Sequence, residues 1–390
     1  MPALTTTDDV LRAVRDMGFA LAGVVDAAPS AHAAFFENWL AEGKHGQMRY
    51  LAEHVAKRLD PTQLLPGARS IICVADRYPP DMPRAPVDAP PGPRGRIARY
   101  AWGDDYHTVI KRRLHDLCDR LREAHPTEQF RAAVDTAPIF EREHAARAGL
   151  GWVGKHTLLI HPREGSYLLL GQIITTLPLA SGTGAEPPIT TDHCGTCTRC
   201  IDACPTGCIT PYSVDASRCI SYLTIEHRER IDPSLHEAMG DWIAGCDICQ
   251  EVCPHNGRER GSEGARERGG DEQAQRPLLS RDMQRSAGAP RHHPAYTPRP
   301  PAPALALIDI LRWSAADRSR VLRNSALKRI KLDMWKRNAL IAAGNALRES
   351  DDAPLRDRIV ELADDPAESD VVRDTARQVL ASSGSEHGQR

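Results

Sequence analysis

The feature that most constrains this chain is a concentration of cysteine. Nine of its eleven cysteines lie within the 60 residues from Cys194 to Cys253. In a reducing compartment such crowding argues against disulfides and favours bound metal. The first run has the form C-x2-C-x2-C-x3-C-P and ends at Pro205, and the second has the form C-x2-C-x3-C-P and ends at Pro254. The sulfurs of each run are therefore held close together by the chain itself.

The first run has the spacing of bacterial ferredoxins. In that pattern three closely spaced thiolates hold one [4Fe–4S] cluster, and the fourth turns away to ligate the other cluster of a pair. Zinc is the alternative, but a zinc site prefers two C-x2-C pairs separated by a longer loop. Soft thiolates at these intervals therefore favour iron–sulfur chemistry.

If the last cysteine of each run ligates the other run's cluster, the cysteines can be assigned to two clusters. The first cluster takes Cys194, Cys197, Cys200 and Cys253. The second cluster takes Cys204, Cys246 and Cys249 and needs one more thiolate. Cys208 and Cys219 are the local candidates, and we favour Cys219 because the loop before it could return it to the cluster. Cys73, in an apolar stretch, and Cys118, in an amphipathic one, are expected to be core thiols.

Hydrophobic periodicity predicts an α/β part followed by a helical part. Expected helices of the first part span residues 7–17, 104–123 and 138–148, and expected strands span 19–25, 70–75, 131–134, 157–161 and 166–177, with a turn joining the last two. The proline-rich residues 79–93 and the Gly/Arg/Glu-rich residues 256–275 are expected to be loops. Five short helices then follow at 303–314, 316–331, 334–347, 354–363 and 368–381, which suggests a small helical-repeat unit.

The near-zero net charge conceals a local imbalance. The chain has 50 basic and 52 acidic residues, which excludes a wholly basic protein that coats nucleic acid. Residues 312–337 nevertheless hold nine Lys/Arg and two Asp, whereas residues 348–390 hold six basic and eleven acidic residues. This basic stripe is either a solvated helix face or a surface for RNA or another polyanion, because phosphate contacts dominate nucleic-acid affinity. Its candidate RNA contacts are Lys328, Arg329, Lys331, Lys336 and Arg337.

Asp135 and a glycine-rich turn are further candidates for chemistry. Asp135 follows an expected strand, so it is either the N-cap of the next helix or a carboxyl group in an apolar cavity, where its neutral form could donate a proton. The turn from Gly149 to Lys155 matches neither a phosphate loop nor a dinucleotide-binding motif. Its three glycines suggest backbone packed against something flat or bulky, with an ordinary loop as the alternative.

Together these motifs resemble the epoxyqueuosine reductases, cobalamin-dependent enzymes of the last step of queuosine formation in tRNA. The resemblance runs from about residue 8 to residue 347. Its specific segments are AKRLDP (56–61), ARYAWGDDYHTVIKRRL (98–114), VDTAPIFEREHAARAGLGWVGKHTLLI (134–160), CGTCTRCIDACPTGCI (194–209), CISYLTIE (219–226), CDICQEVCPHN (246–256) and SALKRIKLDMWKRNALIAAGNA (325–346). Two departures are His255 and Cys208, which stand where the family usually has tryptophan and alanine.

The resemblance implies a fold class of three parts. These are an α/β cobalamin-binding domain built as an α/β sandwich, a ferredoxin-like domain with two [4Fe–4S] clusters, and a C-terminal α-helical HEAT-like repeat. The implied boundaries are 1–182 for the cobalamin-binding domain, 183–256 for the cluster domain, 257–300 for a flexible linker, 301–383 for tRNA-binding helices and 384–390 for a disordered tail.

The resemblance also implies an activity. Epoxyqueuosine at the wobble position of tRNA would be reduced to queuosine by cob(I)alamin fed by the two clusters. The partners would be a tRNA with a GUN anticodon and a low-potential electron donor. Asp135 matches the proton donor of the family, and Cys219 matches its eighth cluster ligand, which agrees with the count above. The cofactor-binding candidates are Arg58, Tyr100, Asp135, Trp152, Lys155 and Ser221.

Two other functions explain part of the sequence. A reductive dehalogenase uses similar parts, but the missing twin-arginine leader and the basic C-terminal helices argue against it. A non-catalytic iron–sulfur electron-transfer protein would leave Asp135 and the basic stripe without a role. No stretch approaches the roughly 20 apolar residues that cross a bilayer, and the first residues do not resemble a signal peptide. A cytoplasmic monomer is therefore expected.

Overall fold

The computed structural model describes residues 4–79, 92–184, 188–189, 191–256, 292–299 and 303–384. The expected loops at 79–93 and 256–275, the linker at 257–300 and the tail at 384–390 lie wholly or largely outside the described residues. Within the described part, no helix combines the length and the apolar character that a membrane span requires.

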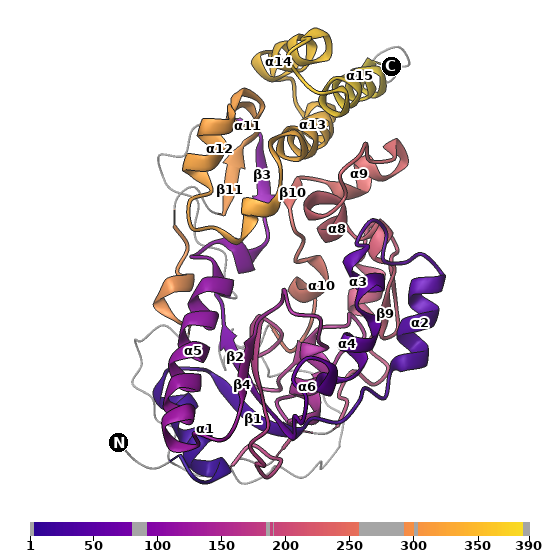
Figure 1. The fold of residues 1–390 in the computed structure, drawn as a ribbon. Helices are drawn as coiled ribbons and strands as arrows, with labels where there is room; N and C mark the ends of the chain where they lie inside the picture. The colour runs from indigo at the N-terminus through magenta and orange to yellow at the C-terminus, as the bar shows by residue number, and fades with distance from the viewer. Residues whose placement is uncertain are drawn as a thin grey trace, which may run out of the picture.

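An antiparallel sheet of four strands organises the first half of the chain. In spatial order its strands are β1 (Leu21–Asp26), β2 (Ser70–Arg77), β7 (Leu168–Thr175) and β4 (Phe130–Ala133). Helices α1 (Thr7–Asp16) and α5 (Tyr106–Ala124) cover one face, and α6 (Glu141–Arg147) covers the other (Figure 1).

Successive residues of β2 alternate between two cores, as the pleat of a strand requires. Ile72 and Val74 pack with α1 and α5, whereas Ile71 and Cys73 pack with α6. This layering agrees with the expected α/β sandwich. Cys73 and Cys118 are fully buried in these two cores, so the prediction that both are core thiols is confirmed.

A second, smaller sheet joins three distant parts of the chain. Its central strand β3 (Arg94–Ile97) runs parallel to β10 (Trp242–Ala244) and antiparallel to β11 (Ala304–Ala306). The sheet therefore crosses the boundaries expected at 182 and 301, and it ties the cluster region and the C-terminal helices to the α/β part.

The cysteine-rich region consists of short elements. They are α7 (Arg199–Asp202), β8 (Ile209–Thr210), β9 (Ser213–Val214), η3 (Ala216–Arg218), α8 (Ile220–Ile225), η4 (Pro233–Leu235), α9 (His236–Met239), β10 and α10 (Ile248–Glu251). Most of the remaining short elements precede this region: α2 (Ala33–Ala41), α3 (Tyr50–Glu53), α4 (Val55–Leu59), η1 (Pro61–Gln63), η2 (Arg99–Ala101), β5 (Trp152–Val153), β6 (Leu159–Ile160) and η5 (Pro294–Tyr296).

The C-terminal part is helical, as expected. Its elements are α11 (Leu307–Arg312), α12 (Ala315–Val321), η6 (Ala326–Arg329), α13 (Leu332–Glu349), α14 (Ala353–Asp364) and α15 (Asp370–Gly384). Helix α13 packs against α11 and α15 within this part and also against β10, α8 and α9 of the cluster region (Figure 1). Most of α13 is therefore buried.

The expected strands at 157–161 and 166–177 are present as β6 and β7, and backbone hydrogen bonds between His161 and Gly165 close the expected turn. The two strands have different partners: β6 pairs with β5, and β7 enters the central sheet. One local prediction was wrong. The expected helix at 316–331 is divided into α12 and η6, and Asn324 between them has a φ of 57°.

Candidate functional site

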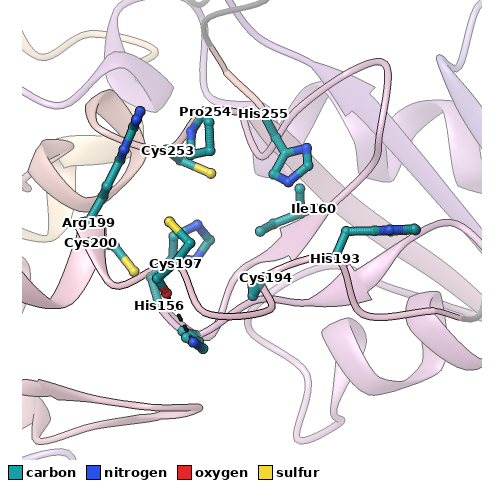
Figure 2. Close-up of a pocket in the computed structure, with 11 residues that line it drawn as sticks. His156, Ile160, His193, Cys194, Cys197, Arg199, Cys200, Cys253, Pro254 and His255 are labelled. Carbon is teal, nitrogen blue, oxygen red and sulfur yellow. Dashed lines mark hydrogen bonds between the residues drawn. The ribbon is translucent and has the colours of Figure 1, made fainter. Parts of the chain in front are cut away.

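Four of the predicted cluster ligands line one cavity. Cys194, Cys197 and Cys200 come from the first run, and Cys253 comes from the second (Figure 2). Short helices α7 and α10 lie against each other and carry the two runs to the same place. This arrangement brings together the four cysteines that ligand exchange between the runs predicts for the first cluster.

Lys155 and Trp152 also lie at the first-cluster cavity. Lys155 Nζ donates to the carbonyl oxygens of Gly195 at 2.6 Å and of Cys197 at 3.0 Å. The buried ring of Trp152 lies edge-on to the rings of His193 and His255, with 4.9 Å between ring centroids in each pair. Neither Lys155 nor Trp152 lines the pocket that contains Asp135. The structure thus places Lys155 and Trp152 at the first-cluster cavity, and their expected role in binding cobalamin stays a prediction.

The glycine-rich turn packs against protein. A side chain at Gly151 or Gly154 would collide with Ile160 of β6, and one at Gly149 would collide with Pro188. Gly151 also has a φ of 150°, which favours glycine. The bulky neighbour expected from the sequence is therefore the β6 strand and the segment around Pro188.

The remaining cluster cysteines gather at a second place. Cys204, from the first run, lies within electrostatic reach of Cys246 and Cys249 from the second run, which is the neighbourhood that the predicted ligand exchange requires. Cys208 is 5% exposed, and its Sγ lies 3.4 Å from Cys204 Sγ. Cys219 interacts with Cys208 and also lines the pocket of Asp135. Cys219 thus connects this second thiol group with that pocket.

It is the grouping of the thiols that suits bound iron. Burial raises the pKa of Cys246 to about 12 and that of Cys253 to about 11, which disfavours free thiolates. A bound cation reverses this preference and holds such sulfurs as thiolates. The grouped donor set therefore fits [4Fe–4S] clusters.

A second pocket, of about 330 Å³, lies where the three parts of the chain meet. Among its lining residues are Tyr100, Tyr106, His107 and Asp135 from the α/β part, Cys219, Ser221 and Glu226 from the cluster region, and Arg329 from the C-terminal part. The predicted residues Tyr100, Asp135 and Ser221 are therefore brought together, although they lie far apart in the sequence.

Asp135 is held in an unusual backbone conformation. It follows β4, has a φ of 44°, and donates its backbone N–H to Glu141 Oε1 at 2.7 Å. Helix α6 begins only at Glu141 and has Phe140 at its N-cap, so the interpretation of Asp135 as an N-cap is wrong. Non-glycine residues with positive φ cost energy and are often found at functional sites.

His107 sets the charge of Asp135. Its Nε2 lies 2.9 Å from Asp135 Oδ2, and its Nδ1 lies 2.8 Å from Asp105 Oδ1. Burial opposes protonation of His107, but the bonds to both carboxylates raise its pKa to about 9. The protein around Asp135, whose side chain is 45% exposed, also disfavours the carboxylate, yet His107, Tyr106 and Arg329 lower the pKa of Asp135 below its usual value.

The neutral Asp135 carboxyl group expected from the sequence is therefore replaced by an Asp135 carboxylate beside a His107 imidazolium. Sequence reasoning gave His107 no role. The signal lay in Asp105, which caps α5 two residues earlier and orients the ring.

Arg58 approaches the same group of charges. Its Nη1 donates to the carbonyl oxygen of Ile139 at 3.4 Å, and the charges of Asp135 and Glu141 act on its guanidinium. Within the described residues, its Nε is buried and has no hydrogen-bond partner. A buried donor without a partner beside a pocket fits a bound polar group.

The basic stripe is not a single surface. Lys328, Arg329 and Lys331 are exposed. Lys336 is buried and paired with Glu368, and Arg337 is fully buried. The prediction that these last two contact RNA is therefore wrong, because α13 is covered on nearly all sides and its cations bind protein groups instead.

The fold and the thiol groups define a two-cluster iron–sulfur protein with a pocket of mixed charge beside its second cluster site. Residues 193–256 match the model of the 4Fe-4S double cluster binding domain, which confirms iron–sulfur over zinc. Residues 58–136 match the model described as epoxyqueuosine reductase QueG, DUF1730.

Relatives that align over most of the chain belong to the same family as these two models. The epoxyqueuosine reductase of Pseudomonas aeruginosa is 36% identical over 334 residues, which cover 85% of this chain and 83% of that one. A crystal structure of epoxyqueuosine reductase with an epoxyqueuosine-modified tRNA-Tyr stem loop superposes with a TM-score of 0.79 at 27% identity, covering 96% of this chain and 89% of that one. A Bacillus subtilis epoxyqueuosine reductase with its aspartate catalytic loop swung out of the active site has a TM-score of 0.78 at 26% identity and covers 96% and 90%. The chain belongs to the epoxyqueuosine reductase family.

Proposed function

We propose that the protein reduces epoxyqueuosine to queuosine at the wobble position of tRNA, using two [4Fe–4S] clusters and cobalamin. The observation that carries this proposal is the pocket in which Asp135, Cys219 and Arg329 meet. It combines a proton relay, a cluster ligand and a cation suited to phosphate. Family membership supports the reaction, and the relative bound to an epoxyqueuosine-modified stem loop supports the substrate.

The residues around the pocket fit a corrin cofactor. Tyr100 and Tyr106 offer aromatic surface, and Ser221 offers a hydroxyl group. The buried Arg58 Nε has no hydrogen-bond partner among the described residues and could donate to a polar group of the cofactor. When bound there, cobalamin would supply the electrons of the reductive step, received from the clusters. Cys219 as the eighth cluster ligand would place the second cluster next to the pocket.

The chain's own residues supply one of the protons that the reaction needs. Loss of the epoxide oxygen as water consumes two electrons, received from the clusters, and two protons, of which the second comes from solvent. At neutral pH the first proton resides on His107, and Asp135 Oδ2 lies 2.9 Å from His107 Nε2. We infer that Asp135 passes this proton to the leaving oxygen, while Asp105 stabilises the imidazolium from the other side. The swung-out aspartate loop of the Bacillus subtilis relative is consistent with a group that acts only in one loop position.

The finer parts of the proposal concern partners and layout. The substrate is a tRNA with a GUN anticodon, contacted by Lys328, Arg329 and Lys331, and the electrons come from a low-potential donor. The C-terminal helices form a HEAT-like tRNA-binding region, and the protein acts as a monomer in the cytoplasm.

Asp135→Asn tests the reaction. The variant should keep both clusters and bound cobalamin but lose turnover by about 10²-fold or more, because an amide cannot relay the proton. The measurement is nucleoside analysis of tRNA carrying epoxyqueuosine after incubation with cobalamin and a reductant. Asp119→Asn, at an exposed position on α5, is the matched control. Full turnover by Asp135→Asn would contradict the role of Asp135, and wild-type activity on an organohalide but not on this tRNA would overturn the proposed substrate.

Iron analysis tests the eighth ligand. Cys219→Ala should lower the iron content from about eight to about four per chain, because a [4Fe–4S] cluster with three thiolates is readily lost. Cys208→Ala, which removes the neighbouring and more deeply buried thiol, should keep about eight. The opposite pattern would assign Cys208 as the ligand.

A further inference from the structure

Arg329 lies at the reaction pocket rather than on a remote helix face. It belongs to η6 of the C-terminal part, and its Nη2 lies 2.6 Å from Glu226 Oε1. Glu226 ends α8 of the cluster region and is mostly buried, with 14% of its side chain exposed, whereas 41% of the Arg329 side chain is exposed. The ion pair therefore bridges two parts of the chain at the rim of the pocket.

Arg329 is shared between two carboxylates. It acts electrostatically on Glu226 and on Asp135, which have Arg228 and His107, respectively, as further cationic neighbours. The hydroxyl groups of Tyr50 and Tyr100 face the same guanidinium. Arg228 also acts electrostatically on Glu226, so the Glu226 carboxylate keeps a nearby positive charge when a second anion takes the exposed side of the Arg329 guanidinium.

An RNA phosphate is the anion that fits this position. Guanidinium binds phosphate through two parallel hydrogen bonds, as it binds a carboxylate. Lys328 and Lys331 flank Arg329 in the sequence and are exposed, so a backbone that reaches Arg329 meets further positive charge.

We propose that Arg329 and Glu226 form an exchangeable latch at the mouth of the pocket. In the free protein the Glu226 carboxylate forms an ion pair with the Arg329 guanidinium. When the anticodon loop arrives, a backbone phosphate next to the inserted nucleoside takes its place, and Arg329 then anchors that nucleoside beside Asp135. The latch rests on the proposed function, because it assumes that the inserted nucleoside belongs to RNA.

The latch predicts opposite effects for its two halves. Glu226→Gln removes the internal competitor and keeps the shape, so it should bind a synthetic anticodon stem–loop RNA several-fold more tightly than the wild type. Arg329→Gln should bind several-fold more weakly and lower the salt slope of binding by about one. The double variant should bind close to Arg329→Gln, because without the guanidinium the Glu226 carboxylate no longer competes with the phosphate. The RNA affinity of Arg329→Lys should fall between those of the wild type and Arg329→Gln. Lysine keeps the positive charge but cannot make two parallel hydrogen bonds to a phosphate.

Fluorescence anisotropy at several salt concentrations measures these affinities with the cluster-loaded protein. Glu237→Gln is the matched control, because Glu237 pairs with Arg348 at 3.2 Å on another part of the surface. It should leave RNA binding unchanged. Equal or weaker binding by Glu226→Gln, or unchanged binding by Arg329→Gln, would overturn the latch. The proposed function fails separately, through loss of wild-type turnover on the modified tRNA.

Discussion

At the scale of single residues, one hydrogen bond changes the chemistry expected of Asp135. Its position after a strand marks it as a candidate, but its charge is set by His107, which lies 28 positions earlier on α5. The His107 imidazolium lies between the Asp105 and Asp135 carboxylates, which stabilise its positive charge, so His107 holds one proton that Asp135 can receive. A carboxylate and an imidazolium in contact can deliver a proton without a strongly raised carboxyl pKa.

The relay predicts a pH dependence. His107 has a pKa of about 9, so it is protonated below that pH and neutral above it. The rate constant for turnover should therefore be level through neutral pH and fall as the pH rises through about 9. His107→Gln should lower the rate at pH 7 by about 10²-fold and remove the alkaline limb, because the proton store is gone. Single-turnover assays between pH 6 and 10 measure both effects, and an unchanged alkaline limb in the variant would contradict the relay.

At the scale of elements, short turns rather than regular helices hold the cluster ligands. Three cysteines of the first-cluster cavity lie on or just before the four-residue helix α7, and the loop before it is tied down from outside by Lys155. The lysine satisfies two carbonyl oxygens and brings a positive charge next to the first cluster site.

Lys155→Met should make the first cluster labile. The apolar chain leaves both carbonyl oxygens without their donor, at a cost of about 1–3 kcal/mol, so the loop opens more often. Iron release to a chelator should become faster for about half of the iron, while the other half, in the second cluster, is released at the wild-type rate. Arg199→Met, an exposed residue at the same cavity, serves as the control. Equal release of all iron from Lys155→Met would show that the lysine does not act on the first-cluster loop.

At the scale of the whole molecule, α13 joins the C-terminal helices to the cluster region through buried polar groups. Arg337 donates to the carbonyl oxygens of Leu223 at 2.7 Å, His227 at 2.8 Å and Glu229 at 2.6 Å. The neighbouring Asn338 donates to the carbonyl oxygens of Thr224 and Ile243, both at 2.9 Å. These bonds fix the position of η6, and with it Arg329, relative to the pocket.

Arg337→Met should therefore destabilise the protein rather than weaken RNA contacts directly. It keeps an unbranched apolar stem but leaves three carbonyl oxygens without their donor, and we expect a loss of about 3 kcal/mol or more in the free energy of unfolding. Denaturant unfolding followed by circular dichroism measures this loss. Lys331→Met, at an exposed position, should change stability by less than about 0.5 kcal/mol. Equal stability of Arg337→Met and the wild type would show that these bonds do not dock α13.

The sequence by itself determined the features that depend on short spacings. The cysteine intervals dictate two clusters and the exchange of ligands between runs, because a thiolate's reach is limited by the few residues around it. Periodicity likewise located α5, the central strands and most C-terminal helices. The tertiary structure decided what depends on neighbours distant in the chain: the charge of Asp135, the burial of Lys336 and Arg337, and the placement of Lys155 at the first cluster. Charge and solvation are set by surrounding groups, and only folding brings those groups together.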